Sequence, residues 1–163
     1  MLEEKIAVVT GASRGIGRAI AKELALKGAF VIVNYNGSKQ AADETVNEIT
    51  QAGGKAVGVQ CNVADAAECE AFINNIISEY GRIDILVNNA GLAIFHDFQQ
   101  YPESAWRAGV ELNLTVPFLM AQAVSRIMIP QGGGKIINIG SSLSFQADCG
   151  SGAYAPTKAG VLG

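Results

Sequence analysis

Five short runs of apolar, mostly β-branched residues divide the chain, and stretches with helical spacing of their apolar residues separate them. The runs cover Ile6–Thr10, Phe30–Asn34, Lys55–Cys61, Ile83–Asn88 and Lys135–Gly140. Strands that are apolar throughout are typical of a parallel sheet with helices on both faces. The pattern therefore predicts an α/β fold built on a doubly wound parallel sheet.

The predicted helices follow from apolar residues spaced three and four apart. They cover residues 14–27, 41–52, 65–80 and 102–129, and a further helix begins near Tyr154. Asp65, with Glu68 three residues later, is typical of a capping box at a helix start. Pro117 predicts a bend in the fourth helix, because proline has no N–H to donate. No long linker interrupts the 163 residues, so we expect a single domain over 1–163.

Composition excludes several classes of protein. Hydrophobic residues make up 49% of the chain and charged residues only 17%, whereas a disordered chain has the opposite balance. A net charge of −3 argues against a nucleic-acid-binding surface, and no apolar run approaches the roughly 18 residues of a membrane span. Three cysteines without CxxC spacing and one histidine, His96, indicate neither a disulfide framework nor a metal site. The acidic start Met1–Lys5 is unlike a secretory signal, so we expect a cytoplasmic protein.

A glycine-rich turn follows the first predicted strand directly. The segment Thr10–Gly17 reads TGASRGIG, with glycines at 11, 15 and 17. Such a turn lets backbone N–H groups and a helix N-terminus approach a pyrophosphate, and Gly17 lets the helix pack close to the sheet. A tight turn without a ligand is the alternative that the glycines alone leave open.

Charge near this turn favours one nicotinamide cofactor. An NAD site usually has an acidic residue at the end of the second strand, but here that strand ends in Asn34-Tyr35-Asn36. Arg14 in the glycine turn and Lys39 after the strand are basic, and a basic residue can neutralise a 2′-phosphate. The sequence therefore favours NADPH/NADP⁺ over NAD, although Arg14 can also be read as an ordinary solvated loop residue.

Tyr154 and Lys158 are four residues apart and share one face of the last predicted helix. A phenol has a pKa near 10, and a nearby ammonium lowers it by favouring the phenolate. Such a tyrosine can exchange a proton with a substrate oxygen while a hydride moves to or from the carbon. The pair alone has a second reading, since tyrosine and lysine at this spacing occur on many helices.

Taken in order, these motifs resemble the short-chain dehydrogenase/reductase family. They are TGASRGIG at Thr10–Gly17, NNAG at Asn88–Gly91, then Asn113, Ser141 and the YxxxK pair at Tyr154–Lys158. The resemblance implies a Rossmann-like sheet with strand order 3-2-1-4-5, from which the family's sixth and seventh strands are missing. It also implies NADPH-dependent reduction of a ketone to a secondary alcohol.

The resemblance assigns four catalytic residues. Tyr154 would transfer the proton, and Ser141 would hydrogen-bond the substrate carbonyl. Lys158 would bind the nicotinamide ribose and lower the pKa of Tyr154. The backbone carbonyl of Asn113 would hold a water bound to the lysine. His96 is expected to be a loop residue near the mouth of the site, without a catalytic role.

The cofactor residues come from the same motifs and from the strand ends. Asn62 and Val63 would contact the adenine ring, Ala90 and Gly91 would lie against the adenosine ribose, and Asn88 and Asn89 would mainly tie the sheet together. The full expected set is Gly11, Ser13, Arg14, Gly15, Ile16, Gly17, Tyr35, Asn62, Val63, Asn89, Ala90, Gly91, Tyr154 and Lys158.

Two substrate classes stay open. The segments ASRGIGRAIA and VIVNY resemble 3-oxoacyl-[acyl-carrier-protein] reductases, whereas GGKIINIGSSLSFQ resembles sugar-acid dehydrogenases of the gluconate 5-dehydrogenase and deoxygluconate dehydrogenase type. The expected partners are a small keto substrate, either free or carried on acyl carrier protein, and further copies of the chain, since the family is usually tetrameric.

The chain stops at Gly163, within the last predicted helix. We therefore expect an incomplete domain whose fifth strand is an exposed sheet edge. A nucleotide-binding fragment without turnover, or a folding unit without activity, are the alternatives to a carbonyl reductase.

Overall fold

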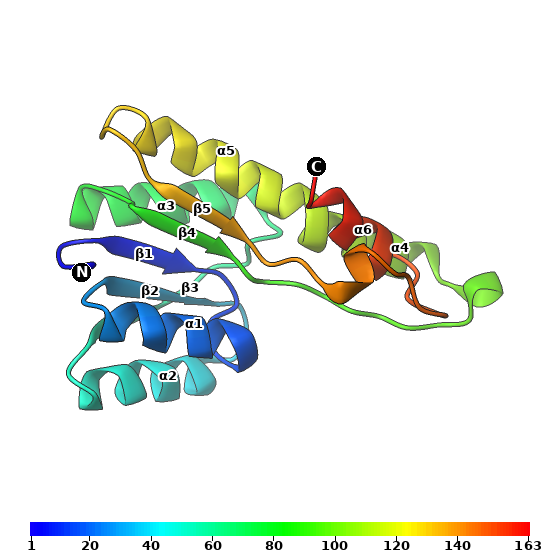
Figure 1. The fold of residues 1–163 in the computed structure, drawn as a ribbon, viewed down its shortest axis with the longest axis horizontal. Coiled ribbons are helices and arrows are strands. Elements are labelled where there is room, and N and C mark those ends of the chain that lie inside the picture. The colour runs from blue at the N-terminus through cyan, green and yellow to red at the C-terminus, as the bar shows by residue number, and fades with distance from the viewer.

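A computed structural model describes the whole chain, residues 1–163, and shows five strands in one sheet (Figure 1). The strands are β1 (Ile6–Val9), β2 (Phe30–Tyr35), β3 (Lys55–Gln60), β4 (Ile85–Asn88) and β5 (Lys135–Asn138). Their order is β3-β2-β1-β4-β5, and every neighbouring pair is parallel. The predicted α/β class and the strand order implied by the resemblance are confirmed.

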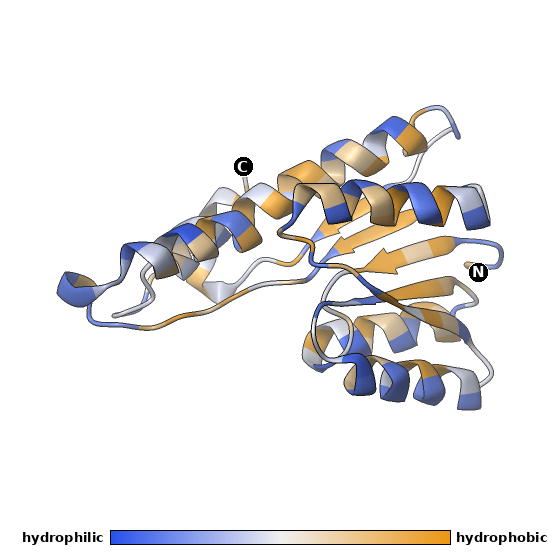
Figure 2. Ribbon diagram, turned by 180° about the vertical axis from the view of Figure 1, so that it is seen from behind, coloured by the Kyte–Doolittle hydropathy of each residue, from blue (hydrophilic) through white to orange (hydrophobic).

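Helices cover both faces of the sheet. They are α1 (Gly15–Leu26), α2 (Lys39–Gln51), α3 (Ala66–Tyr80), α4 (Glu103–Val110), α5 (Val116–Met128) and α6 (Tyr154–Gly160). α1 and α2 lie on one face and α3 and α5 on the other, while α4 and α6 lie beyond the carboxyl ends of the strands (Figure 1). Figure 2 shows apolar strands between helices whose outer faces are hydrophilic. No helix combines the length and the apolar character needed to cross a membrane.

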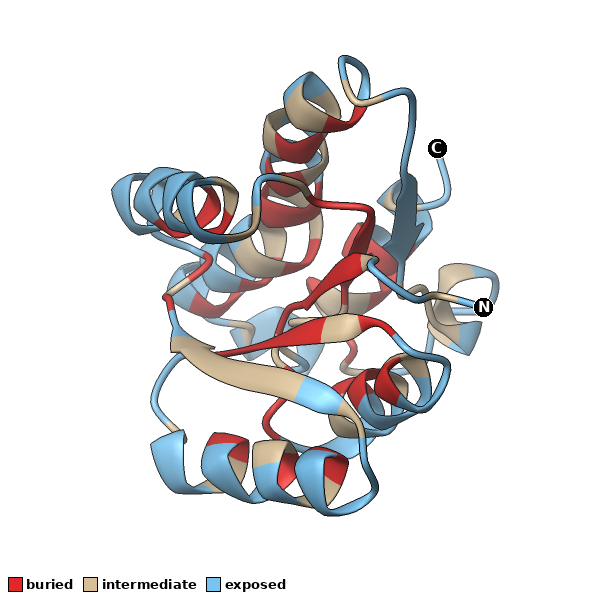
Figure 3. Ribbon diagram, turned by 90° about the vertical axis from the view of Figure 1, so that its left-hand side faces the viewer, coloured by how far each residue is buried: buried red, intermediate tan, exposed pale blue.

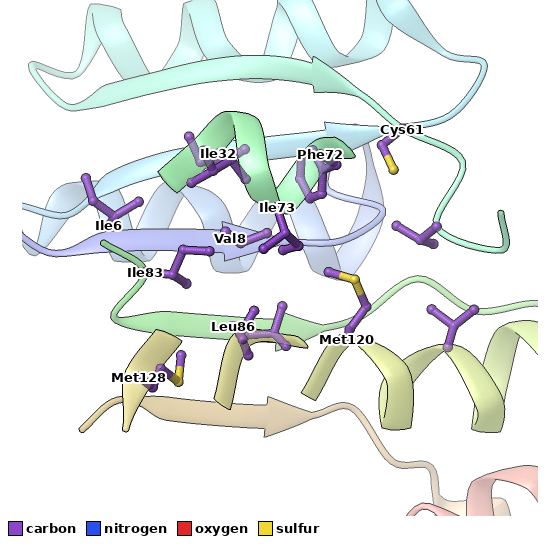
Figure 4. Packing of buried hydrophobic residues seen from close by; sticks show 14 residues of the cluster. Ile6, Val8, Ile32, Cys61, Phe72, Ile73, Ile83, Leu86, Met120 and Met128 are labelled. Atoms are coloured by element: carbon purple, nitrogen blue, oxygen red, sulfur yellow. The ribbon is translucent and has the colours of Figure 1, made fainter. Parts of the chain in front are cut away.

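Successive residues of each central strand belong to two different cores. Val8 packs with Ile32 and Leu86 in the core beneath α3 and α5 (Figure 4). Its neighbour Val9 packs with Val33 in the core beneath α1 and α2. Because side chains alternate between the faces of a strand, a sheet with two cores needs strands that are apolar throughout. The continuous apolar runs of the sequence have this cause.

The start of α3 shows half of the predicted capping box. The Asp65 carboxylate accepts the Glu68 N–H at 3.0 Å, as expected. The Glu68 carboxylate instead accepts the N–H of Asn62 at 2.7 Å. This second bond fixes the turn after β3, which carries the residues expected to contact adenine.

The predicted helix 102–129 consists of three parts. α4 and α5 are joined by a π-helical turn at Glu111–Thr115, just before the proline that predicted the bend. Pro117 lies four residues after Asn113 and has no N–H, so the Asn113 carbonyl lacks the donor that an α-helix would provide. The irregular turn therefore falls at the residue whose carbonyl is expected to hold a water.

Asp84 links the amino end of β4 to the amino end of β1 by hydrogen bonds. Its buried carboxylate accepts the Ile6 N–H at 3.0 Å, two hydrogen bonds from Arg82 at 2.6 and 2.8 Å, and one from Lys5 at 3.1 Å. Burial by itself raises the pKa of Asp84, but these hydrogen bonds, led by that from Arg82, hold the pKa below its usual value. The ionised carboxylate thus stabilises the folded chain.

β5 forms one edge of the sheet, as expected, and pairs only with β4. All of its residues are exposed, including Ile136 at 37% and Ile137 at 45% (Figure 3). The opposite side of β4 lies against β1 in the buried centre of the sheet. An exposed apolar edge of this kind favours association with further strands.

Candidate active site

A pocket of about 340 Å³ opens at the carboxyl ends of β1 to β4. Because these strands are parallel, the turns that follow them lie at the same edge of the sheet. Ligands of open α/β sheets bind in this position. The pocket brings together many of the expected cofactor residues: Gly11, Ser13, Arg14, Tyr35, Asn62, Val63, Asn89, Ala90 and Gly91. Gly15, Ile16 and Gly17 form the adjacent first turn of α1, and Tyr154 and Lys158 lie on α6.

The glycine turn needs glycine at three positions for two different reasons. Gly11 and Gly15 have φ of +61° and +58°, a region that disfavours other residues. A Cβ at Gly17 would lie 2.5 Å from both the Gly11 carbonyl oxygen and Asn89 Nδ2. The Asn89 amide itself donates to the carbonyls of Thr10 and Gly11 at 2.8 and 3.2 Å. The close approach of α1 to the strand ends therefore depends on Gly17.

The first turn of α1 offers unpaired donors. The N-cap residue Arg14 makes no side-chain hydrogen bond to this turn, so its N–H groups have no cap. The first N–H groups of any helix also lack intrahelical partners. These groups, at Gly15, Ile16 and Gly17, can hold an anionic group such as a pyrophosphate.

Three basic residues near the pocket have different surroundings. Arg14 is exposed and lines the pocket. Arg18 is held by Glu48 and by the Ser13 carbonyl. Lys39 donates to the Asp43 carboxylate at 2.7 Å and does not line the pocket. Of the two basic residues that the sequence offered to a 2′-phosphate, only Arg14 therefore lies at the pocket.

Lys158 is buried, with 5% exposure, and its Nζ donates to the Ile139 carbonyl at 2.6 Å. The same Nζ lies 5.9 Å from the centre of the Tyr154 ring. Burial lowers the pKa of Lys158 below the usual value for lysine. The structure thus brings the ammonium and the phenol together, on the face of α6 that the four-residue spacing predicts.

The side chain of Asn113 joins three segments around α6. Its Oδ1 accepts the Leu92 N–H and its Nδ2 donates to the Leu92 carbonyl, both at 2.8 Å. Nδ2 also donates to the Thr157 hydroxyl at 3.3 Å. A Cβ at Gly91 would lie 3.3 Å from Asn113 Oδ1 and 3.8 Å from Lys158 Nζ. Gly91 therefore lies between the pocket and the lysine.

Ser141 lies at the start of the 3₁₀ turn Ser142–Ser144. Its hydroxyl accepts the Leu143 N–H at 3.2 Å and makes no hydrogen bond with Tyr154. The Ser144 hydroxyl accepts the Ser141 N–H at 3.2 Å and donates to the Lys158 carbonyl at 2.8 Å. The serine turn is thus fastened to α6, on the turn that carries the lysine.

Sequence reasoning missed two buried polar residues at the strand ends. The Thr10 hydroxyl accepts the N–H groups of Asn89 and Ala90 at 3.0 and 2.9 Å. Asn34, with 2% exposure, hydrogen-bonds the turns after β1 and β3. Thr10 was signalled by its place at the end of an apolar strand, directly before the glycine motif, whereas the sequence carried no comparable signal for Asn34.

Comparison with known proteins gives the same assignment as the motifs. The family described as short chain dehydrogenase matches residues 5–163. The chain belongs to this family. A 3-oxoacyl-[acyl-carrier-protein] reductase of Synechocystis sp. is 45% identical over 99% of the chain and 66% of that protein. The corresponding reductase FabG of Staphylococcus aureus is 43% identical over 98% of the chain and 65% of that protein.

A solved structure has the same fold. A metagenomic short-chain oxidoreductase in complex with NADP superimposes with a TM-score of 0.94 at 35% identity, covering 99% of the chain and 73% of that protein. The chain spans about two thirds of the length of the curated short-chain dehydrogenase relatives named above.

Proposed function

We propose that residues 1–163 form one NADP(H)-binding domain that reduces a ketone to a secondary alcohol, with a 3-oxoacyl thioester of acyl carrier protein as the preferred substrate. The observation that carries this proposal is the position of Gly91, which lines the pocket and is near enough to Lys158 that an added Cβ would lie 3.8 Å from Nζ. A nucleotide in the pocket would therefore end beside the acid–base pair. The names of the reductase relatives support the substrate class.

The residues present fit a dinucleotide. Gly17 leaves the helix N-terminus close to the strand ends, and the uncapped first turn of α1 can accept a pyrophosphate. Ala90 and Gly91 would lie against the adenosine ribose, and Asn62 and Val63 against adenine. The exposed Arg14 would neutralise a 2′-phosphate, for which no acidic residue at the end of β2 competes. NADP is therefore proposed over NAD, and the NADP complex of the solved relative supports this choice.

When bound, the cofactor supplies hydride to the carbonyl carbon. Tyr154 donates its phenolic proton to the carbonyl oxygen, and Ser141 donates a hydrogen bond to the same oxygen. The Lys158 ammonium stabilises the phenolate that results, because an opposite charge nearby favours the ionised form. The Asn113 carbonyl, which lacks its α-helical donor, holds a water through which the proton is replaced.

We propose a homo-oligomer, a tetramer as the family resemblance implies, that acts in the cytoplasm. A sugar-acid dehydrogenase is the second candidate, because GGKIINIGSSLSFQ around Ser141 resembles that class.

The test combines binding with turnover. NADPH and NADH are titrated into the chain by calorimetry, and NADPH oxidation is followed with a short 3-oxoacyl thioester and with 5-ketogluconate. We expect tighter binding of NADPH, turnover of the thioester, and loss of turnover but not of NADPH binding in Tyr154→Phe. Arg14→Ala should remove the preference for NADPH. Binding without turnover of either ketone supports the nucleotide-binding fragment, and turnover of the sugar acid alone supports the second candidate.

A further inference from the structure

Asn34, the residue before the last of β2, connects two turns that are not neighbours in the sheet. Its Oδ1 accepts the Gly11 N–H at 3.2 Å, and its Nδ2 donates to the Cys61 carbonyl at 3.0 Å. Its own backbone carbonyl accepts the Ala12 N–H at 2.9 Å. Gly11 follows β1 and Cys61 follows β3, with β2 between them. One buried amide therefore spans the distance between two separate turns.

These bonds lie where the sheet ladder ends. The last paired residues of β1 and β2 are Val9 and Val33, and after them the chain turns into the glycine loop. On the other side of β2 the pairing ends at Tyr35 and Gln60. Past these points one backbone hydrogen bond ties each turn to β2: the Ala12 N–H donates to the Asn34 carbonyl and the Cys61 N–H to the Tyr35 carbonyl, both at 2.9 Å. The Asn34 side chain adds a direct link between the two turns themselves.

Both turns form walls of the same pocket. One wall carries Gly11, Ser13 and Arg14, and the other carries Asn62 and Val63. An adenosine with its phosphates would lie between these walls, so their spacing decides whether the pocket is formed before binding. A pocket that is already formed binds more tightly, because its walls need no ordering when the ligand arrives.

We propose that Asn34 is a positioning residue for the adenosine half of the cofactor: its amide holds the two walls at the spacing that the nucleotide requires. This rests on the proposed function, since it assumes that the pocket takes a nucleotide. Only an amide of this length supplies an acceptor for one turn and a donor for the other. Aspartate would keep the bond to Gly11 but place a carboxylate oxygen against the Cys61 carbonyl.

The test compares Asn34→Leu and Asn34→Asp with a matched control, Asn88→Leu. Asn88 is also a buried asparagine at a strand end, and its Nδ2 donates to the Pro117 carbonyl and to Asn138. Asn34 is among the residues that line the pocket, whereas Asn88 is not. The probes are NADP⁺ and 2′-phospho-ADP-ribose, which lacks nicotinamide, titrated by calorimetry. Hydrogen exchange of the chain without cofactor reports on the two walls directly.

We expect Asn34→Leu to raise the Kd of both probes by on the order of tenfold, the loss expected for one or two hydrogen bonds. Exchange should accelerate in both walls in Asn34→Leu but only around Cys61 in Asn34→Asp. Asn88→Leu should lose stability without weakening 2′-phospho-ADP-ribose. An Asn34→Leu chain that is less stable but binds both probes as the wild type does would overturn the proposal, and so would unchanged exchange in both walls. A wild-type chain that binds neither probe overturns the proposed function, while the exchange comparison still decides whether Asn34 holds the walls.

Discussion

Replacing Gly17 with alanine tests whether the nucleotide pocket depends on the close approach of α1 to the sheet. A Cβ at this position would lie 2.5 Å from the Gly11 carbonyl oxygen and from Asn89 Nδ2, whereas ordinary contacts begin at 3.4 Å. The difference, 3.4 − 2.5, requires a displacement of about 0.9 Å. Because one of the two atoms belongs to the backbone, rotation of a side chain cannot supply it, and α1 has to move away from the strand ends.

We predict that Gly17→Ala lowers the free energy of unfolding by about 1–3 kcal/mol, the usual cost of overpacking. For a chain of this size, Tm should fall by roughly 2–4 °C for each kcal/mol. The displacement also moves the first N–H groups of α1 away from a bound pyrophosphate. The Kd of NADP⁺ should therefore rise by on the order of tenfold, as for the loss of one or two hydrogen bonds. Circular dichroism on heating and calorimetric titration measure the two effects.

Gly15 provides the matched control, since its constraint is conformational. It has φ of +58°, and nothing lies within 4 Å of an added Cβ. Asparagine tolerates this left-handed conformation better than alanine, so Gly15→Asn should keep most of the stability that Gly15→Ala loses. Gly17→Asn should be at least as harmful as Gly17→Ala. If Gly17→Ala keeps the Tm and the Kd of the wild type, or if asparagine is tolerated at 17 as well as at 15, the steric explanation is wrong.

Three further predictions concern stability and thiol reactivity. The hydrogen bonds to Asp84 lower its pKa, so they stabilise the folded chain fully above about pH 4, and this stabilisation is lost as pH falls through the lowered pKa. The urea midpoint should therefore change less between about pH 5 and pH 3 in Asp84→Asn than in the wild type. Equal changes in the two chains would contradict this. Gly152→Ala should lower the free energy of unfolding by about 1–3 kcal/mol, because a Cβ would overlap the Tyr101 ring at a φ of +44°; a urea midpoint equal to that of the wild type would exclude the clash. Burial raises the pKa of the Cys61 thiol to about 12. Iodoacetamide at about pH 8 should therefore modify the exposed Cys149 much faster than the buried Cys61, which peptide mass spectrometry can measure. Comparable rates at the two thiols would refute this prediction.

The sheet could be predicted because its cause is visible in consecutive residues. Val8 and Val9 face different cores, and a strand with two cores has no polar face to interrupt the run. The order of the strands came from the family resemblance, since apolar runs carry no information on which strands are neighbours. The helix predicted over 102–129 contains a π-helical turn at Glu111–Thr115. Apolar spacing does not distinguish this turn from an α-helix, and only Pro117 signalled an irregularity.

The site was predictable where a residue is required by backbone shape or by a motif. Gly11 is an example, because its positive φ and its place after the first strand both follow from the turn. Asn34 was not predictable, since its partners are backbone groups of two turns that become neighbours only in the folded sheet. Lys39 is the opposite case, a residue that the sequence suggested for the site but that does not line the pocket. Its sequence position suits a 2′-phosphate, but a pairing with Asp43 one helical turn later occupies its ammonium.

The environment of Lys158 shows how the sheet edge contributes to the proposed chemistry. A buried ammonium needs a hydrogen-bonding partner, and the Ile139 carbonyl, just beyond β5, provides it at 2.6 Å. An ammonium has three donors, so two remain for the nicotinamide ribose and the water that the family resemblance assigns to Lys158. Arginine would present a wider planar group to the same carbonyl. A lysine therefore suits this position because the chain just beyond β5 accepts one of its hydrogen bonds and two further donors stay available on the same nitrogen.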